Sequence, residues 1–445
     1  MRINKISVTK LFGIFNHPVS FNMEDRITMI HGPNGFGKTA LLRIINGFFN
    51  SRYSELRSIP FAEFRLDFSN DTHLLITKSS DDQTIENEKD KELTFHFVQP
   101  GLKPKRYSSS LAVDLKQNGL GLSIIEDIVP GLERIAHTTW FYLATQEKLS
   151  LEDVWQRFGN FLPENLATVK KEPKWLSEIQ SSIDVRFIEV QRLLSLSGVP
   201  KAQVQRRRPS MMPSVDIYPQ ELAEDIKTKL AEYGALSQSL DRTFPARVVN
   251  NKAPLELTEE TLRKKLNKIE EKRSRLIETG LLDKDEYPDF QVEKHIDGTT
   301  KNILSVYVQD VENKLMLFKE LATKIELFKK IIKQRFLYKN MSISKDKGFT
   351  FTTVDGKPLS PTNLSFGEQH ELVMLYQLLF KVQPNSLVLI DEPEISLHVA
   401  WQVQFLKDLQ EIIKLANFDV LLATHSPDII NDRWDLTVEL QGPTE

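Results

Sequence analysis

The sequence predicts an α/β fold in which a long helical segment separates two sheet-forming parts of the chain. Three short apolar runs, at 184–190, 387–390 and 420–424, are typical of strands that are buried on both faces. Alternating apolar and polar residues between 61 and 98 predict an antiparallel β-subdomain. Apolar residues that recur every three or four positions from 311 to 336 predict a helical arm of coiled-coil length.

The composition is ordinary for a globular protein and excludes several kinds of site. The chain has 445 residues, a formal net charge of −3 and no cysteine. Disulfides, thiolate zinc sites and cysteine nucleophiles are therefore excluded. At this net charge we expect no large basic surface, although a local basic patch stays open. No apolar run approaches the roughly 20 residues that span a bilayer, and residues 1–6 alternate like a strand, so we expect a cytoplasmic protein.

The first forty residues contain a glycine-rich loop between a predicted strand and a predicted helix. The strand at 26–30 leads into G-P-N-G-F-G-K-T at 32–39, which is the G-x-x-x-x-G-K-[ST] pattern in its required context. In such a loop the backbone N–H groups wrap phosphates, Lys38 reaches the β- and γ-phosphates, and Thr39 binds Mg²⁺. The alternative is a glycine-rich turn without a ligand. The predicted nucleotide contacts are Gly32, Pro33, Asn34, Gly35, Phe36, Gly37, Lys38 and Thr39.

The middle of the chain offers packing residues and one candidate ligand. From about 124 to 180 the pattern is helical and aromatic, and we interpret its aromatic residues as core: Trp140, Phe141, Trp155, Phe158 and Trp175. Gln191 follows the strand at 184–190, where a glutamine amide could reach Mg²⁺ and the γ-phosphate; an ordinary loop amide is an equal alternative. The polar stretch at 79–90 is interpreted as a solvated hairpin loop.

Residues 196–217 are rich in Ser and Pro and predict a linker, and residues 218–340 predict a helical insertion. The arginine triplet at 206–208 is either a nucleic-acid contact or a solvated run. Thr258 is expected to cap a helix that begins with two glutamates. The polar stretch at 283–297 matches no metal-loop spacing and is interpreted as a loop. A basic helix face either binds a partner or DNA, or is simply solvated: Lys265, Lys268, Lys272 and Arg275.

Chemistry-bearing residues return in the last hundred residues. The apolar strand at 387–390 ends in Asp391 and Glu392, at the end of a strand where open α/β sheets bind their ligands. A metal ion and a water explain two such carboxylates more simply than a core acid pair does: Asp391 would bind Mg²⁺, and Glu392 would polarise the attacking water. The segment L-S-F-G-E at 364–368 begins a helix, and His425 follows the last buried strand.

These four motifs stand in the order found in the ATP-binding-cassette (ABC) ATPase superfamily. The chain resembles the branch that holds the SMC, RecF and OLD-family ATPases more than it resembles a transporter subunit. The phrases D-E-P-E-I-S-L-H at 391–398 and T-H-S-P at 424–427 are typical of OLD-like ATPases. Val399 stands where a proline usually follows the histidine, for which we expect only a looser helix start. The resemblance implies an ABC-ATPase head, that is, a P-loop mixed sheet and an antiparallel β-subdomain with an inserted helical coiled-coil hairpin.

The resemblance also implies an activity, its cofactors and a dimer. The activity is ATP hydrolysis, at a slow rate, with ATP and Mg²⁺ as cofactors. In a head-to-head dimer, the signature residues Ser365, Gly367 and Glu368 of one protomer would contact the γ-phosphate on the other protomer's P-loop. Glu392 would catalyse hydrolysis, and His425 would contact the γ-phosphate and sense its loss. Such dimers are expected to assemble into a larger homo-oligomer.

Within this superfamily the chain resembles the ATPase component of two-gene anti-phage systems, PARIS first, through the phrase at 236–245, and Septu second. OLD-family nucleases carry a Toprim domain after the ATPase, and we expect no room for one after His425. The implied partners are a separate Toprim or HNH nuclease and a phage-encoded trigger protein, without a membrane partner. A DNA-repair ATPase of the RecF or SMC type, with DNA as its partner, is the alternative. The expected domains are two ATPase lobes, at 1–195 and 341–445, around the linker and the insertion.

Overall fold

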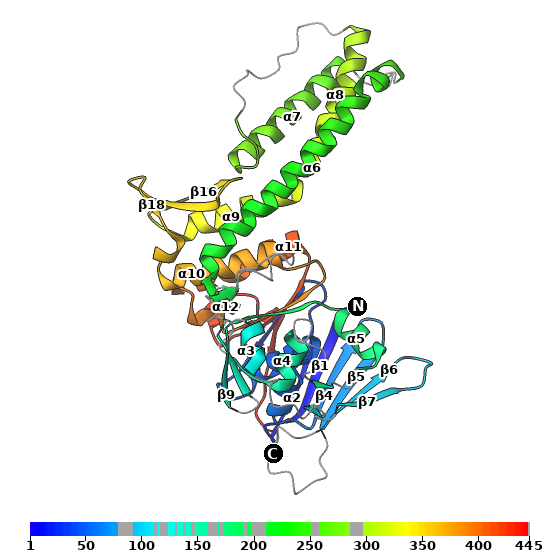
Figure 1. Cartoon of the computed structure of the whole chain (residues 1–445), viewed down its shortest axis with the longest axis vertical. Coiled ribbons are helices and arrows are strands. Elements are labelled where there is room, and N and C mark those ends of the chain that lie inside the picture. The colour runs from blue at the N-terminus through cyan, green and yellow to red at the C-terminus, as the bar shows by residue number, and fades with distance from the viewer. Residues whose placement is uncertain are drawn as a thin grey trace. The chain divides into compact units, whose positions relative to one another are not determined.

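The computed structural model describes residues 1–78, 92–109, 114–115, 123–129, 131–136, 139–143, 147–158, 167–168, 172–189, 194–196, 211–250, 258–284 and 297–443. The chain divides into two compact units. The first consists of Met1–Ser214 and Val373–Glu445, and the second of Val215–Leu372. Figure 1 follows the chain from blue N-terminal strands through green and yellow helices to red C-terminal elements. The predicted α/β class with an inserted helical segment is confirmed.

A parallel sheet of five strands forms the centre of the first unit. Its strands, in spatial order, are β13 (Val185–Glu189), β19 (Leu387–Asp391), β20 (Asp419–Ala423), β3 (Ile27–His31) and β21 (Thr437–Glu439). The first four residues of β19 are all buried, as expected for a parallel strand covered on both faces. Since parallel strands end at one edge, the segments after β3, β19 and β20 meet there. The three sequence motifs that follow these strands are thereby brought together.

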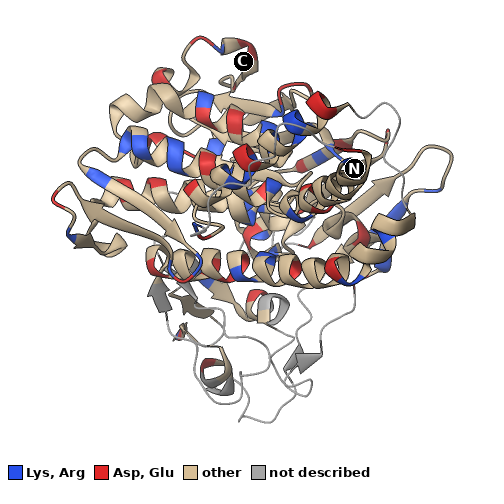
Figure 2. Ribbon diagram, turned by 90° about the horizontal axis from the view of Figure 1, so that it is seen from above, with Lys and Arg blue, Asp and Glu red and all other residues tan. Residues whose placement is uncertain are grey.

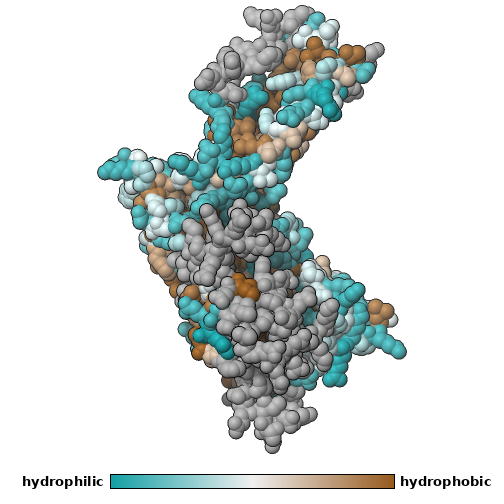
Figure 3. All heavy atoms as spheres, in the orientation of Figure 1, coloured by the Kyte–Doolittle hydropathy of each residue, from teal (hydrophilic) through white to brown (hydrophobic). Residues whose placement is uncertain are grey.

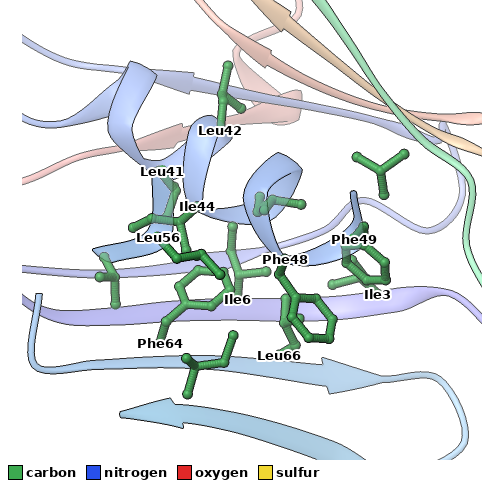
Figure 4. Close-up of a cluster of buried hydrophobic side chains, with 14 of the residues drawn as sticks. Ile3, Ile6, Leu41, Leu42, Ile44, Phe48, Phe49, Leu56, Phe64 and Leu66 are labelled. Atoms are coloured by element: carbon green, nitrogen blue, oxygen red, sulfur yellow. The ribbon is translucent and has the colours of Figure 1, made fainter. Parts of the chain in front are cut away.

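A six-stranded antiparallel sheet forms the second layer of the same unit. Its spatial order is β2 (Phe15–Ser20), β1 (Ile3–Leu11), β4 (Glu63–Phe68), β5 (His73–Lys78), β6 (Leu93–Val98) and β7 (Lys105–Ser109). Burial alternates along β2 and β4, so one face of the sheet packs on the core. Helix α1 (Lys38–Phe49) covers that face: Leu41, Ile44 and Phe48 join Ile6 and Phe64 in one buried cluster (Figure 4). The P-loop helix is thus held between two sheets.

The segment from 124 to 180 is less helical than its pattern predicts. Helices α3 (Ser123–Ile128), α4 (Leu151–Phe158) and α5 (Lys174–Ser181) are present, but an antiparallel sheet of β9 (Leu132–Ala136), β10 (Thr139–Tyr142) and β11 (Glu147–Ser150) lies between them. The purely helical interpretation was wrong because aromatic side chains fit a half-buried pleated surface as well as a helix. Trp140 and Phe158 are buried in one cluster, Phe141 is half-buried, and the Trp175 ring stacks on Phe97. The Trp155 side chain lies outside the described part.

Short elements connect these layers and lead to the second unit. Helix α2 (Tyr53–Ser58) follows α1, and β8 (Asp114–Leu115) pairs with β12 (Ala167–Thr168). Strand β14 (Leu194–Leu196) pairs with β15 (Met211–Pro213). Strand β15 and the first residues of α6 (Ser214–Asn250) fall within the segment predicted as a linker, and the arginine triplet at 206–208 lies outside the described residues.

In the described part of the second unit, four helices and a small sheet precede the start of α10 (Phe366–Tyr376). The helices are α6, α7 (Glu259–Glu278), α8 (Gly298–Met316) and α9 (Lys319–Arg335), and the sheet contains β16 (Lys339–Ser344), β17 (Gly348–Thr353) and β18 (Pro358–Leu359). Thr258 caps α7 as predicted, since its side chain accepts a hydrogen bond from the N–H of Thr261. The apolar stripe from 311 to 336 is buried as predicted, but a two-residue turn at 317–318 divides it between α8 and α9.

The basic face of α7 is partly used inside this unit. Lys272 lies 3.9 Å from Glu312 of α8, and Arg275 forms a two-pronged ion pair with Glu326 of α9. Lys265 and Lys268 are exposed. Figure 2 shows acidic and basic residues interspersed along the helices, which is the pattern of a solvated, ion-paired surface. Half of the predicted basic face therefore serves packing between helices.

The surface of the described residues is mixed in character. In the face drawn in Figure 3, hydrophobic residues form separate groups among hydrophilic ones. Within the described ranges no helix has both the length and the apolar composition that a membrane crossing requires.

The remaining helices and turns flank or contain the predicted motifs between residues 361 and 436 of the sequence. They are a 3₁₀ turn at Pro361–Asn363, α10 (Phe366–Tyr376), a π-helical turn at Gln377–Lys381, a 3₁₀ turn at Pro393–Ile395, α11 (Val399–Ala416), α12 (Pro427–Ile430) and a 3₁₀ turn at Trp434–Leu436. Helix α11 starts at Val399, and His398 caps it by accepting a hydrogen bond from the N–H of Ala400 at 3.2 Å. Val399 therefore takes the first helical position that a proline would favour, and the helix start is capped without it.

Candidate functional site

The glycine-rich loop closes around its own lysine at the edge of the parallel sheet. It follows β3, and Gly37 forms the N-cap of α1 with φ 89°. Gly35 has φ 87°, so both residues adopt a left-handed conformation that favours glycine. Lys38 is buried, and its Nζ donates hydrogen bonds to the carbonyls of Gly32 at 2.8 Å and Pro33 at 3.3 Å. Its charge is thereby held inside the loop, where an anion would be bound.

The first turn of α1 contacts the end of β19. The Thr39 hydroxyl donates a hydrogen bond of 3.1 Å to Oδ1 of Asp391, a residue 352 positions away in the chain. Hydroxyl and carboxylate oxygens are ligands that Mg²⁺ accepts in phosphate-binding sites. A Cβ built on Gly35 would meet no atom within 4 Å, so the outer side of the loop is open. The donor set and the open loop fit a nucleotide phosphate with Mg²⁺.

The next residue, Glu392, has an unusual backbone. Its φ of 44° and ψ of 55° are left-handed, which costs a non-glycine residue roughly 1–3 kcal/mol. Its N–H donates a hydrogen bond of 2.9 Å to the carbonyl of Ala423, which holds the turn against the end of β20. This strained turn directs the chain from the sheet edge into the 3₁₀ turn that follows. Strain of this kind gathers at functional sites, where the surrounding structure enforces it.

His425 lies beside two acids of that turn. Its Nδ1 is 3.6 Å from Oε1 of Glu392 and 3.4 Å from Oε1 of Glu394. The sequence-based prediction identified Glu392 and His425 but overlooked Glu394. Glu394 is visible in the sequence as the last acid of D-E-P-E at 391–394. Only the folded turn brings its carboxylate next to His425. Asp391, Glu392 and His425 are therefore brought to one edge of the sheet, together with Thr39.

A second overlooked residue supports the glycine-rich loop from β2. His17 is 1% exposed, and its Nε2 lies 2.8 Å from the carbonyl of Phe36. Because a carbonyl can only accept, Nε2 carries the hydrogen of this bond. Burial lowers the pKa of His17, although its bond to Phe36 acts in the opposite direction. The rings of Phe15 and Phe36 lie 5.2 Å apart beside it. The hydrogen bond from His17 therefore fixes the loop at Phe36.

Phe12 is a third residue that the sequence-based prediction overlooked. It lies in the turn between β1 and β2 with φ 53°, and 45% of it is exposed. A Cβ built on Gly37 would lie 3.4 Å from its ring and 2.4 Å from Cδ2 of Leu11. An exposed aromatic face therefore borders the start of α1. Such a face can stack on a planar ring held by the same loop.

The signature residues belong to the second unit. The N–H and hydroxyl of Ser365 both donate to Oε2 of Glu368, at 2.9 and 2.8 Å, which forms a capping box at the start of α10. Burial raises the pKa of Glu368, but hydrogen bonds from Lys339 and Ser365 outweigh this effect, and the pKa is lowered. Gly367 lies in the first turn of α10, and Phe366 is 63% exposed. The helix start thus presents a serine, an exposed aromatic ring and backbone N–H groups.

Two further predictions concern this site. Gln191 lies outside the described residues, so its expected contact with Mg²⁺ stays a prediction. Among the described residues, no group of three or more His, Asp or Glu side chains forms a metal cluster. The set predicted from the sequence, in which the Thr39 hydroxyl, the Asp391 carboxylate and the Gln191 amide hold Mg²⁺, stays a prediction.

The family model of the AAA ATPase domain matches residues 1–430 of the chain. The chain belongs to the AAA ATPase domain family. A glycine-rich loop after a strand of the parallel sheet, an antiparallel β-layer and an inserted helical unit confirm the predicted α/β fold class. No curated protein matches the chain.

The solved structures similar to this chain include SMC head domains. The SMC head with an extended coiled coil bound to the C-terminal domain of ScpA, derived from Pyrococcus furiosus, is 11% identical, with a TM-score of 0.36 and coverage of 99% of this chain and 94% of that one. The SMC head bound to the C-winged helix domain of ScpA is 11% identical, with a TM-score of 0.33 and coverage of 97% and 91%. The SMC head domain from Thermotoga maritima is 12% identical, with a TM-score of 0.32 and full coverage of both chains.

Proposed function

We propose that this AAA-family chain binds ATP with Mg²⁺ and hydrolyses ATP slowly. The observation that carries the proposal is the 3.1 Å contact between Thr39 and Asp391, with Glu392 and His425 at the same sheet edge. The loop at 32–39 holds the phosphates through its N–H groups, and Lys38 neutralises the β- and γ-phosphates. Thr39 and Asp391 hold Mg²⁺, which neutralises charge on the transferred phosphoryl group when it is bound.

In this proposal Glu392 accepts the proton. It orients a water and takes a proton from it as the water attacks the γ-phosphorus, the bond from that phosphorus to the β,γ-bridging oxygen breaks, and ADP and phosphate are the products. His425, whose Nδ1 is 3.6 Å from Glu392, contacts the γ-phosphate and responds to its loss. The left-handed backbone of Glu392 sets the direction of its side chain from the sheet edge. The exposed ring of Phe12 stacks on the adenine.

The signature residues complete this site in a second copy of the chain. The start of α10 presents Ser365 and the N–H of Gly367, and a helix N-terminus favours an anion. The P-loop and the signature belong to different compact units of the chain. We therefore propose a head-to-head dimer in which each signature, with Glu368 as its cap, closes on the nucleotide of the partner.

The biological role that we propose is that of a sensor and scaffold in an anti-phage defence system. The chain would hold a separate Toprim or HNH nuclease on a homo-oligomer and release it when a phage-encoded trigger binds. The support is the sequence of the motifs at 391–398 and 424–427, which is typical of OLD-like ATPases, together with the resemblance to the PARIS and Septu ATPases. A DNA-repair ATPase with DNA as its partner is the alternative outcome of the test below.

The test is purification of the Glu392→Gln variant, co-expressed with its native neighbouring genes, in ATP and Mg²⁺. This variant binds ATP without hydrolysing it, so it retains the closed assembly, and mass photometry and mass spectrometry identify the assembly and its partners. A stoichiometric nuclease on a homo-oligomer supports the defence scaffold. DNA without a second protein contradicts it. The matched control is Lys38→Ala, which should show no ATP-dependent assembly at all.

A further inference from the structure

Two acids of the turn after β19 lie close to His425, and they are buried to different extents. The side chains of His425 and Glu392 are 43% and 27% exposed, whereas that of Glu394 is 7% exposed. Glu392 has a role in the proposed hydrolysis, but Glu394 has none. A buried carboxylate beside a proposed catalytic ring requires an explanation, because burial of an acid is costly.

The contacts of Glu394 all converge on the residues around His425. Its Oε1 accepts hydrogen bonds from the Thr424 hydroxyl and from the backbone N–H of His425, both at 2.8 Å. Nδ1 of the His425 ring lies 3.4 Å from the same oxygen. The second oxygen, Oε2, is buried and has no hydrogen-bond partner among the described residues. One carboxylate oxygen therefore binds the backbone N–H of His425 and lies beside Nδ1 of its ring.

We propose that Glu394 is a positioning residue for the hydrolysis: its buried carboxylate sets the tautomer and the orientation of His425. The inference rests on the proposed ATPase function. Two carboxylate oxygens, at 3.4 and 3.6 Å from Nδ1 of His425, favour the tautomer that carries its hydrogen on that nitrogen, because a carboxylate can only accept. In the neutral ring, Nε2 is then an acceptor directed away from both acids. A histidine fixed in this way presents one defined nitrogen to the reacting groups, as a carboxylate-oriented histidine does in other hydrolases.

The loop that carries His425 is also held by contacts that do not depend on the charge of Glu394. The N–H of Ser426 donates to the Thr424 hydroxyl at 3.0 Å, and the Ser426 hydroxyl donates to Oε1 of Gln402 at 2.8 Å. Nε2 of Gln402 in turn donates to the backbone carbonyl of Glu394 at 3.2 Å. A glutamine at position 394 has the same shape and can accept the same two hydrogen bonds. Glu394→Gln therefore changes the charge that faces the ring and leaves the loop anchored.

The test compares the steady-state ATPase activity of the full-length wild type, Glu394→Gln, His425→Ala and the double variant. We expect Glu394→Gln to lower kcat about 10- to 100-fold, while the Kd for ATP changes less than about twofold. In the His425→Ala background, Glu394→Gln should have no further effect, because it acts through the missing ring. Glu394→Asp, which keeps the charge, should recover part of the loss. A merely structural residue would lower ATP binding and the melting temperature together with kcat.

The matched control is Asp428→Asn, which removes one negative charge from an exposed residue three positions after His425. It should leave kcat within about twofold of the wild-type value, since solvent and salt screen a charge on an exposed side chain. The inference is overturned if Glu394→Gln retains wild-type kcat, or if its effect and that of His425→Ala multiply. If the wild type itself shows no more ATPase activity than Lys38→Ala, the proposed function has failed, and this inference fails with it.

Discussion

The buried ion pair between Arg335 and Glu371 allows a quantitative test of how the signature helix is held. Arg335 ends α9 and Glu371 lies in α10, and their side chains are 5% and 0% exposed. Oε2 of Glu371 is buried, and no group in the described part of the chain forms a hydrogen bond with it. Replacing Arg335 with methionine keeps most of the buried volume but leaves the carboxylate without its opposite charge. An uncompensated buried charge costs about 3–5 kcal/mol, so we expect Arg335→Met to lower the free energy of unfolding by this amount.

The assay is urea unfolding followed by circular dichroism at the helical band, since this unit is mostly helix. The double variant Arg335→Met/Glu371→Leu removes both charges, and we expect it to return to within about 1–2 kcal/mol of the wild type. The control is Arg275→Met, which breaks an exposed ion pair with Glu326 and should cost at most about 1 kcal/mol. A loss below about 1 kcal/mol for Arg335→Met, or a double variant no more stable than the single one, would refute the argument.

The remaining predictions concern the loop at 32–39 and the buried histidines. Lys38→Ala should abolish nucleotide binding, measured with a fluorescent ATP analogue, because it removes the buried cation of the loop. Gly37→Ala should lower the melting temperature and the nucleotide affinity more than Gly35→Ala does. Both glycines have positive φ, but of the two new Cβ atoms only the one at position 37 would meet a described atom, Cδ2 of Leu11, at 2.4 Å. Burial lowers the pKa of both His17 and His370, so the unfolded chain binds more protons than the folded chain below about pH 6.5. Stability should therefore be complete above that pH and decrease as the pH falls through the folded pKa values; thermal melts that rise between pH 7 and pH 5.5 would contradict this reasoning.

Patterns that depend on neighbouring residues were readable from the sequence. A continuous apolar run predicts the buried strand that ends at Asp391, because a parallel strand covered on both faces has no polar side. Thr258 predicts the start of α7, because an N-cap needs only a side-chain acceptor for an N–H group two or three residues later. Glycines at fixed spacing predict the loop at 32–39. Gly35 and Gly37 adopt positive φ angles, which glycine permits. The sequence by itself therefore determined the fold class and the candidate phosphate site.

Contacts between distant residues were decided by the tertiary structure alone. Thr39 meets Asp391 across 352 positions only because β3 and β19 are parallel strands of one sheet that end at the same edge. The sheet interleaved with α3 and α4 was overlooked because aromatic residues suit both strands and helices. Glu394 reaches His425, and His17 reaches the carbonyl of Phe36, through turns and strand pairings that no local periodicity encodes. Local pattern specifies which element forms, whereas the partner of each side chain depends on the packing of elements that are distant in the chain.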